Sequence, residues 1–122
     1  MAYPVGDPNS DEPGSGARAN AGKPDLSLVP LHLLEPVARV FMHGRDRKKD
    51  PYPAWNWAKG MPWTVPFACM LRHAAAWFRG QTLDPESGQS HVAHVIANGF
   101  MLLHYEASFP AGDDRPTQFQ EF

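Results

Sequence analysis

The sequence has a single cysteine and no long apolar run, and both absences exclude classes of protein. Cys69 alone cannot form an internal disulfide, which suits a reducing compartment. No apolar run approaches the ~20 residues that span a bilayer. The amino terminus also lacks the charged start and apolar core of a secretory signal. We therefore expect a soluble protein in the cytoplasm, without a membrane partner.

The chain also lacks an excess of positive charge, since 11 basic and 13 acidic residues give a formal net charge of -2. Duplex nucleic acid is bound by neutralising many phosphates, so this balance disfavours it as a partner. The one basic cluster, residues 45–49, is more typical of a solvated loop than of a nucleic-acid patch. We expect no binding to duplex nucleic acid.

Large apolar side chains are scarce at both ends of the chain. Residues 1–22 are rich in Pro, Gly, Asp, Ser and Asn and cannot bury enough surface to offset their ordering entropy, so we predict a disordered arm. Residues 110–122 are predicted to form a flexible tail, whose Phe119 and Phe122 would dock on a neighbour or on another copy of the protein. The working domain is then 23–109. A domain of about 85 residues buries only ~60 to 65% of its unfolded surface, so we expect a homo-oligomer.

Apolar residues recur at helical spacing, and no credible pair of strands is present. The spacing predicts three helices, at about 31–43, 64–80 and 90–107. The last two are expected to pack as an antiparallel hairpin. The fold class is therefore all-α, a small helical bundle. Between the first two helices, residues 45–63 form a loop rich in Trp and Pro, whose prolines forbid a regular element and whose aromatics must fold onto the domain.

Local signals place the helix ends. Pro36 predicts that the first segment, 31–43, begins with a short turn and continues as a helix from about Glu35. Gly44 is a natural carboxyl-terminal end for this helix. Thr64 and Ser90 are expected to cap the other two helices. Gly99 lies inside the last helix at a cost of ~1 kcal/mol relative to Ala, which favours a close helix contact there.

The hairpin concentrates chemically active side chains around its loop. Counting ~1.5 Å per residue from the helix ends places Trp77 level with His94 and His73 level with Asn98. Two helices and the acidic loop would then surround one cleft with three histidines, two carboxylates, an arginine, an indole and an amide: His73, His91, His94, Asp84, Glu86, Arg72, Trp77 and Asn98.

Each of these residues also has a structural interpretation. The three histidines and Asn98 would serve equally well as hydrogen bonds between helices, and acids before a helix are common caps. If the group instead binds a metal, imidazole favours Mn²⁺, Zn²⁺ or a similar ion over Mg²⁺. The candidate ligands are His73, Asp84, Glu86, His91 and His94.

Several motifs together resemble the amino-terminal dATP/dGTP diphosphohydrolase family of phage proteins, over residues 22–107. They are Lys23-Pro24 before Leu28-Val29-Pro30, Asn56-Trp57-Ala58-Lys59-Gly60-Met61-Pro62-Trp63, Arg72-His73 to Trp77 with Arg79-Gly80, and Asp84-Pro85-Glu86-Ser87-Gly88 to His91, His94 and Asn98. The resemblance implies a small helical phage protein that handles purine nucleotides in the cytoplasm of the infected host cell, and the family name implies release of pyrophosphate.

Two departures from the family pattern argue against hydrolysis. Gln81 stands where the family usually has Glu, and residues 49–55 replace a Lys-Tyr-Gly-like run before Asn-Trp. All-α nucleotide pyrophosphatases hold Mg²⁺ with helical carboxylates. The helices that face this cleft offer none, and Glu35 is distant.

Three hypotheses of function follow. The favoured one is a protein that encloses or sequesters a purine nucleotide or nucleotide-derived signal, a host immune signal being one candidate. Aromatic rings, Trp55 among them, would stack on its base, and cations would hold its phosphates. The alternatives are a metal-dependent dATP/dGTP diphosphohydrolase and a protein-interaction module. The candidate ligand-binding residues are Lys23, Trp57, Lys59, Trp63, Arg72, His73, Trp77, Arg79 and Asn98.

Overall fold

The computed structural model describes residues 5–119 and divides the chain into two compact units, Met1–Pro30 and Leu31–Phe122. In the first unit, an isolated bridge joins Val5 to Arg18, and a 3-10 turn, η1 (Leu26–Leu28), begins at the Asp25 cap. The disordered arm over 1–22 stays a prediction, and its residues 1–4 lie outside the described part. So does Phe122 of the predicted tail.

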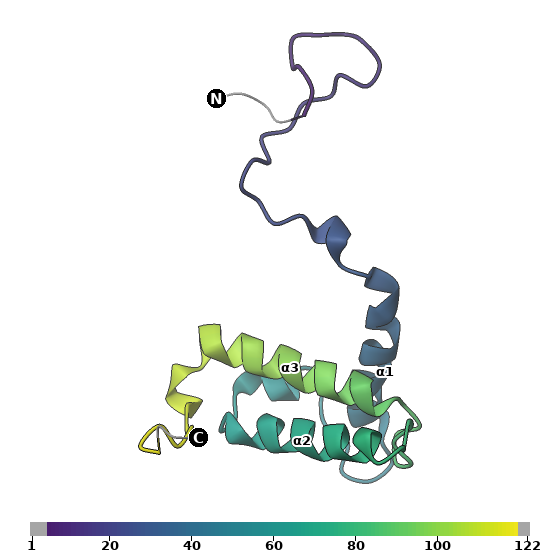
Figure 1. Ribbon diagram of the computed structural model, residues 1–122, viewed down its shortest axis with the longest axis vertical. Helices are drawn as coiled ribbons and strands as arrows, with labels where there is room; N and C mark the ends of the chain where they lie inside the picture. Colours follow the sequence, from purple (N-terminus) through teal and green to yellow (C-terminus); the bar gives the residue numbers. More distant parts are fainter. Residues whose placement is uncertain (1–4, 120–122) are drawn as a thin grey trace. The chain divides into compact units, whose positions relative to one another are not determined.

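The second unit is all-α, as the periodicity predicts (Figure 1). Its elements are η2 (Leu31–Leu33), α1 (Leu34–Asp46), η3 (Asn56–Lys59), α2 (Thr64–Phe78), α3 (His91–Ser108) and η4 (Pro110–Gly112). α2 and α3 lie side by side as the predicted hairpin, and α1 packs against α3. No helix within residues 5–119 is long and apolar enough to cross a membrane.

The core of this unit is small and lies where α1 meets α3. Val37 packs on Ala93 and Ala97, with Val40 and Phe41 partly buried around them. The two alanines keep the helices close, and little apolar surface is left for a larger core. The architecture therefore depends on additional polar and aromatic anchors.

A second set of contacts ties the Trp/Pro-rich loop and the tail to the hairpin. Tyr105 is fully buried and its hydroxyl donates to the Trp57 carbonyl, 2.5 Å away. The Trp63 indole N–H donates to the Phe109 carbonyl at 3.0 Å, and the Arg115 guanidinium lies 5.0 Å from the Trp63 ring centre. The aromatic loop is thus held along the carboxyl-terminal half of α3.

Some predicted helix ends are confirmed and others are wrong. Ser90 caps α3 by accepting from the Val92 amide. Thr64 is not a cap: it is the first residue of α2, and its amide and hydroxyl both donate to the Asp114 carboxylate, at 2.9 and 2.6 Å. A cap 50 residues away gives no local signal.

Three details of the loop and the glycines also differ from expectation. α1 runs through Gly44, which instead accepts a hydrogen bond from the Tyr52 amide at 2.9 Å and lies against that ring. Within residues 5–119, no atom beyond the neighbouring backbone of α3 lies within 4 Å of a Cβ added at Gly99, so the predicted close helix contact is wrong. A regular element does form in the loop, as η3 occupies a stretch without proline.

Candidate functional site

The loop that joins α2 to α3 determines how the histidines meet. After Gly80, which has φ +98°, the chain turns back alongside α2, and the Gln81 amide donates to the Ala76 carbonyl at 3.1 Å. The His91 amide then donates to the Thr82 carbonyl at 3.0 Å. α3 therefore begins beside the last turn of α2.

This connection shifts α3 along α2 by about one helical turn from the predicted register. The His73 ring stacks on His94 rather than facing Asn98, with ring centres 4.1 Å apart and an angle of 8° between the planes. Asn98 faces Cys69 instead, at 3.5 Å. Trp77 lies outside the main cluster of histidines and is half exposed.

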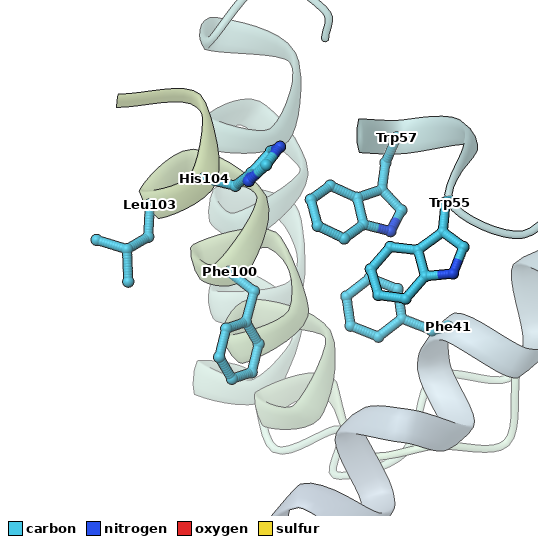
Figure 2. Close-up of a pocket in the computed structure, with 6 residues that line it drawn as sticks. All are labelled: Phe41, Trp55, Trp57, Phe100, Leu103 and His104. Atoms are coloured by element: carbon cyan, nitrogen blue, oxygen red, sulfur yellow. The ribbon is translucent and has the colours of Figure 1, made fainter. Parts of the chain in front are cut away.

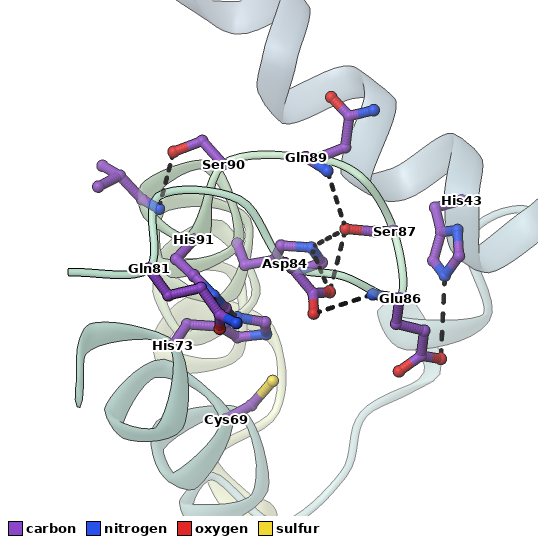
Figure 3. Close-up of polar contacts among 12 residues, drawn as sticks. His43, Cys69, His73, Gln81, Asp84, Glu86, Ser87, Gln89, Ser90 and His91 are labelled. Carbon is purple, nitrogen blue, oxygen red and sulfur yellow. Dashed lines mark hydrogen bonds and ion pairs between the residues drawn. The ribbon is translucent and has the colours of Figure 1, made fainter. Parts of the chain in front are cut away.

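Three polar side chains of α3 face the interior: His91, His94 and Asn98 are all buried, and each has a hydrogen-bond partner. Figure 3 shows His91 beside His73 and Gln81. His91 Nδ1 lies 2.8 Å from His73 Nδ1, and its Nε2 lies 2.7 Å from Gln81 Oε1. The Asn98 side-chain amide nitrogen donates to the His94 carbonyl within α3 at 2.8 Å, and its contact with α2 is the one to Cys69 Sγ.

Asp84 and Ser87 complete the cluster from the loop. The Ser87 hydroxyl donates to Asp84 Oδ2 at 3.0 Å and lies 2.6 Å from His94 Nε2. Asp84 Oδ2 is also 3.3 Å from that nitrogen. The Glu86 amide donates to Asp84 Oδ1 at 3.3 Å. This Asx-type turn holds the carboxylate against the histidines.

The surroundings favour the neutral forms of His73 and His94 and the charged form of Asp84. Burial, and then the neighbouring His73, lower the pKa of His94 to about 4, although Asp84 opposes this. Burial likewise lowers the pKa of His73. For Asp84 burial alone would raise the pKa, but hydrogen bonds from Glu86 and Ser87 and the nearby His94 outweigh it, so the pKa is lowered. Neutral imidazoles and a carboxylate are the forms that bind metal ions.

A cavity of about 930 Å³, the main cavity, opens beside this cluster. This volume lies within the range of small-molecule sites. One part of its wall is aromatic, from Phe41, Tyr52, Trp55 and Trp57, and another part is polar, from Arg72, His73, Asp84, Glu86, His91, His94 and Asn98.

A smaller apolar pocket of about 420 Å³ shares the aromatic wall of the main cavity. Its lining is Phe41, Trp55, Trp57, Phe100, Leu103 and His104 (Figure 2). The Trp57 ring lies 5.8 Å from that of Trp55 and meets the edge of His104 at 5.4 Å. His94 and His104 are ten residues apart on α3, or about 15 Å. Trp57 therefore lies toward the carboxyl-terminal half of α3, whereas His94 lies in its amino-terminal half.

The remaining candidate residues lie elsewhere. Trp63 is buried against the tail, and Lys59, Trp77 and Arg79 do not line the main cavity. Lys23 belongs to the other unit. Among the metal candidates, Glu86 is exposed, with its carboxylate 4.0 Å from His43.

Sequence reasoning missed several residues of this region. Ser87 and Gln81 hold the histidine cluster, and Phe41, Tyr52 and His43 line the main cavity. The spacing Asp84-x-x-Ser87 was an available signal, because a carboxylate and a hydroxyl three apart favour a side-chain-bonded turn. No sequence signal indicated that Phe41 and Tyr52 line the main cavity, because these side chains come together only through tertiary packing.

Comparison with known proteins gives the family. The chain matches the family model described as dATP/dGTP diphosphohydrolase, N-terminal, over residues 13–115. It is 30% identical over 102 residues to a protein of Salmonella phage PMBT28 named dATP/dGTP diphosphohydrolase. That alignment covers 83% of this chain and 33% of the relative, so the chain spans about a third of the relative's length. No solved structure matches. The resemblance drawn from the motifs is thereby confirmed: the chain belongs to the dATP/dGTP diphosphohydrolase amino-terminal family.

Proposed function

We propose that this chain is a phage protein that binds and encloses a purine nucleotide in the main cavity, in the cytoplasm of the infected host. The observation that carries the proposal is a single cavity of about 930 Å³ with an aromatic wall and a polar wall that carries Arg72, three imidazoles and the carboxylates of Asp84 and Glu86. A nucleotide has the matching chemistry, a flat base at one end and an anion at the other. The family description supports a purine nucleotide in particular.

The base is proposed to stack on Trp55 and Trp57. Trp57 is half-buried and braced by Phe41 at 5.7 Å, so it offers a fixed ring, whereas Trp55 is largely exposed and free to cover the ligand. Stacking on aromatic side chains contributes ~1 to 3 kcal/mol per base. It is also tolerant of base identity. Selection of purines would then depend on the depth of the cavity and on hydrogen bonds at its wall.

The phosphates are proposed to lie at Arg72. This side chain lines the main cavity next to His73 and makes no hydrogen bond or ion pair with any residue in the described range 5–119. Arg45 also lines the cavity, but its guanidinium already pairs with Asp46 at 2.7 Å. An unpaired guanidinium beside a cavity favours bidentate recognition of an anion.

Calorimetry with dATP and dGTP in a chelator tests the proposal. Arg72→Ala is expected to weaken binding about 10-fold or more, because a hydrogen bond to a charged group contributes ~1.5 to 3 kcal/mol. Trp57→Ala should weaken it about 5-fold or more. Arg79→Ala is the matched control, since Arg79 lies outside the main cavity at the end of the same helix. If no purine nucleotide binds to the folded wild-type protein, the proposal is rejected.

A second candidate function is metal-dependent release of pyrophosphate from dATP or dGTP, the activity named for the phage relative. The observation that favours it is the group of His73, Asp84 and His94 on the cavity wall. A metal there would activate water for attack on phosphorus. Pyrophosphate release by wild-type protein with added Zn²⁺ or Mn²⁺, and its loss in Asp84→Asn, would favour hydrolysis over sequestration.

The protein is also proposed to be a homo-oligomer that pairs through α2. The outward side of this helix carries no charged residue: Phe67, Leu71 and Phe78 are exposed, with Ala74 and Ala75 between them. A contiguous patch of exposed apolar side chains on a soluble protein marks a surface for interaction with another protein. Across a two-fold axis, two antiparallel copies of α2 would place Phe67 opposite Phe78 and Leu71 opposite Ala74. This self-complementary pattern favours a second copy of the chain as the partner.

A further inference from the structure

Three side chains from three parts of the hairpin converge on one point of the main-cavity wall. His73 comes from α2, Asp84 from the connecting loop and His94 from α3. One potential ligand atom of each lies within 4.8 Å of the others. His94 Nε2 and Asp84 Oδ2 are 3.3 Å apart. Two ligands that bind a tetrahedral metal at about 2.0 to 2.1 Å are themselves about 3.4 Å apart.

The hydrogen bonds behind His73 fix which of its nitrogens is available. Gln81 Oε1 is a carbonyl oxygen and only accepts, so His91 Nε2 carries the hydrogen of this 2.7 Å contact. When His91 is neutral, its Nδ1 is the acceptor, so His73 Nδ1 donates across 2.8 Å. His73 Nε2 then keeps a lone pair, which lies in the ring plane. Because that plane is parallel to the His94 ring, 4.1 Å away, the His73 ring must turn out of the stack to share an ion with His94. This backing of one ring nitrogen is the usual outer shell of a metal-binding histidine.

The carboxylate is oriented in the same way. Asp84 Oδ1 accepts from the Glu86 amide, and Oδ2 accepts from the Ser87 hydroxyl. Because that hydroxyl has one hydrogen, its 2.6 Å contact with His94 is donated by His94 Nε2 in the metal-free protein. Binding of an ion at Nε2 would require this hydrogen to move to Nδ1. The backbone of Asp84 is also held on both sides, by Gln89 at 2.8 Å and Gly88 at 2.7 Å. A carboxylate fixed by its own loop loses little freedom on binding an ion.

We propose that His73, Asp84 and His94 bind one transition-metal ion of the Zn²⁺ class, and that Gln81 is a positioning residue that acts through His91. Two imidazoles and one carboxylate favour Zn²⁺, Co²⁺ or Mn²⁺ over Mg²⁺. Three protein ligands leave a position open toward the main cavity, as in catalytic rather than structural zinc sites. That a nucleotide phosphate fills this position rests on the proposed function above.

This ligand set is narrower than the five residues that the sequence predicts. His91 uses both ring nitrogens in contacts with His73 and Gln81, so it supports the site rather than binding the ion. Glu86 is exposed and its carboxylate lies near His43. Neither is needed to complete the three-ligand set.

Titration of the chelator-treated full chain with Co²⁺ and Zn²⁺, without nucleotide, tests the site. The expected result is one ion per chain, with a visible Co²⁺ spectrum of the tetrahedral type. His94→Gln and the near-isosteric Asp84→Asn should each lose binding at least 10-fold. His104→Gln is the matched control, because His104 lies on α3 outside the cluster. Wild-type protein that binds no ion, or His104→Gln losing as much as His94→Gln, overturns the assignment.

The role of Gln81 has its own test. Gln81→Leu is expected to weaken Zn²⁺ binding about 10- to 100-fold, as loss of outer-shell partners does elsewhere. Gln81→Glu should restore it, because a carboxylate accepts the same N–H. Imidazole nitrogen resonances of the metal-free protein should report the hydrogen on Nε2 of His91 and on Nδ1 of His73, and Gln81→Leu should alter that pattern. Equal affinity in all three proteins overturns the positioning role.

These outcomes separate the metal site from nucleotide binding. The metal is titrated without nucleotide, and the nucleotide is titrated in a chelator. An ion that binds while every purine nucleotide fails supports this inference and rejects the proposed function. A nucleotide that binds to a chain unable to hold Zn²⁺ or Co²⁺ does the reverse.

Discussion

Trp55 has an unfavourable backbone conformation and an exposed side chain. Its φ is +66°, in the left-handed region, which costs ~1 to 2 kcal/mol for a residue with a Cβ. Trp55 is 72% exposed, so the burial of its side chain offsets little of this conformational free energy. Strained residues cluster at functional sites, where the surrounding structure holds them in place. A base that covers the indole would account for a tryptophan here.

Replacing Trp55 should therefore separate stability from binding. Trp55→Gly removes the left-handed strain and loses little buried surface, so we expect the free energy of unfolding to stay within about 1 kcal/mol of wild type. The affinity for dATP or dGTP should fall about 5-fold or more with the lost stacking. Urea unfolding and calorimetry measure the two effects. A large loss of stability with unchanged affinity would make Trp55 a purely structural residue.

His94 makes the stability of the metal-free protein depend on pH. Its pKa is about 4 when folded, against ~6.5 when unfolded, so the unfolded chain binds more protons between these values. Stability is then fully present above about pH 6.5 and falls as the pH is lowered toward 4, by about 2 to 3 kcal/mol. The lowered pKa of His73 acts in the same direction.

Urea unfolding in a chelator, at pH 7.5 and pH 4.5, measures this dependence. His94→Gln should flatten it, whereas His104→Gln should leave it unchanged. A wild-type protein equally stable at both pH values would contradict the burial of a neutral His94.

At the scale of helices and turns, two glycines offer opposite tests. Gly99 lies inside α3 with open space around it, so Gly99→Ala should stabilise the protein by ~0.5 to 1 kcal/mol through helix propensity. Gly60 has φ +100°, and a Cβ there would meet the Phe109 ring at 2.7 Å. Gly60→Ala should therefore destabilise by more than ~1 kcal/mol. Melting temperatures that move in the same direction for both variants would contradict the helix and turn assignments.

The helices could be predicted from the sequence, but their ends and register could be predicted only in part. Local periodicity is sufficient for α2 and α3, because apolar positions repeat within each segment. The cap of α2 by Asp114 and the docking of Tyr52 on Gly44 depend on residues distant in the chain or brought together by a fold-back. The one-turn shift of the hairpin came from the backbone hydrogen bonds of its loop, which spacing does not reveal.

The candidate site was predictable to a similar degree. The motif around the loop correctly gathered His73, Asp84 and His94, because they lie on either side of one short connection. Trp77 belonged to the same motif and lies elsewhere, since a one-turn shift is enough to move it past the cluster. The aromatic wall of the main cavity contains Phe41 of α1 and Trp57 of η3. Only tertiary packing brings these two residues together.

At the scale of the whole molecule, the small core leaves α2 without cover on one side. If two copies pair there, Leu71→Glu or Phe78→Glu should convert a dimer to a monomer, because each would bury a charge at the centre or edge of the contact. Light scattering coupled to gel filtration measures the mass. Ile96→Glu, at a half-exposed site on α3, is the control and should stay dimeric. A monomeric wild-type protein would contradict the pairing.

The four tryptophans allow the most direct test of nucleotide binding in the main cavity. Trp55 and Trp57 line this cavity, Trp63 is buried with its indole N–H bonded to Phe109, and Trp77 lies outside it. Indole N–H resonances, assigned with single Trp→Phe variants, should be followed during titration with dGTP or dATP in a chelator. We expect saturable shifts for Trp55 and Trp57, with the resonances of Trp63 and Trp77 unmoved. No shift of any indole, or a shift of Trp77 alone, would contradict it.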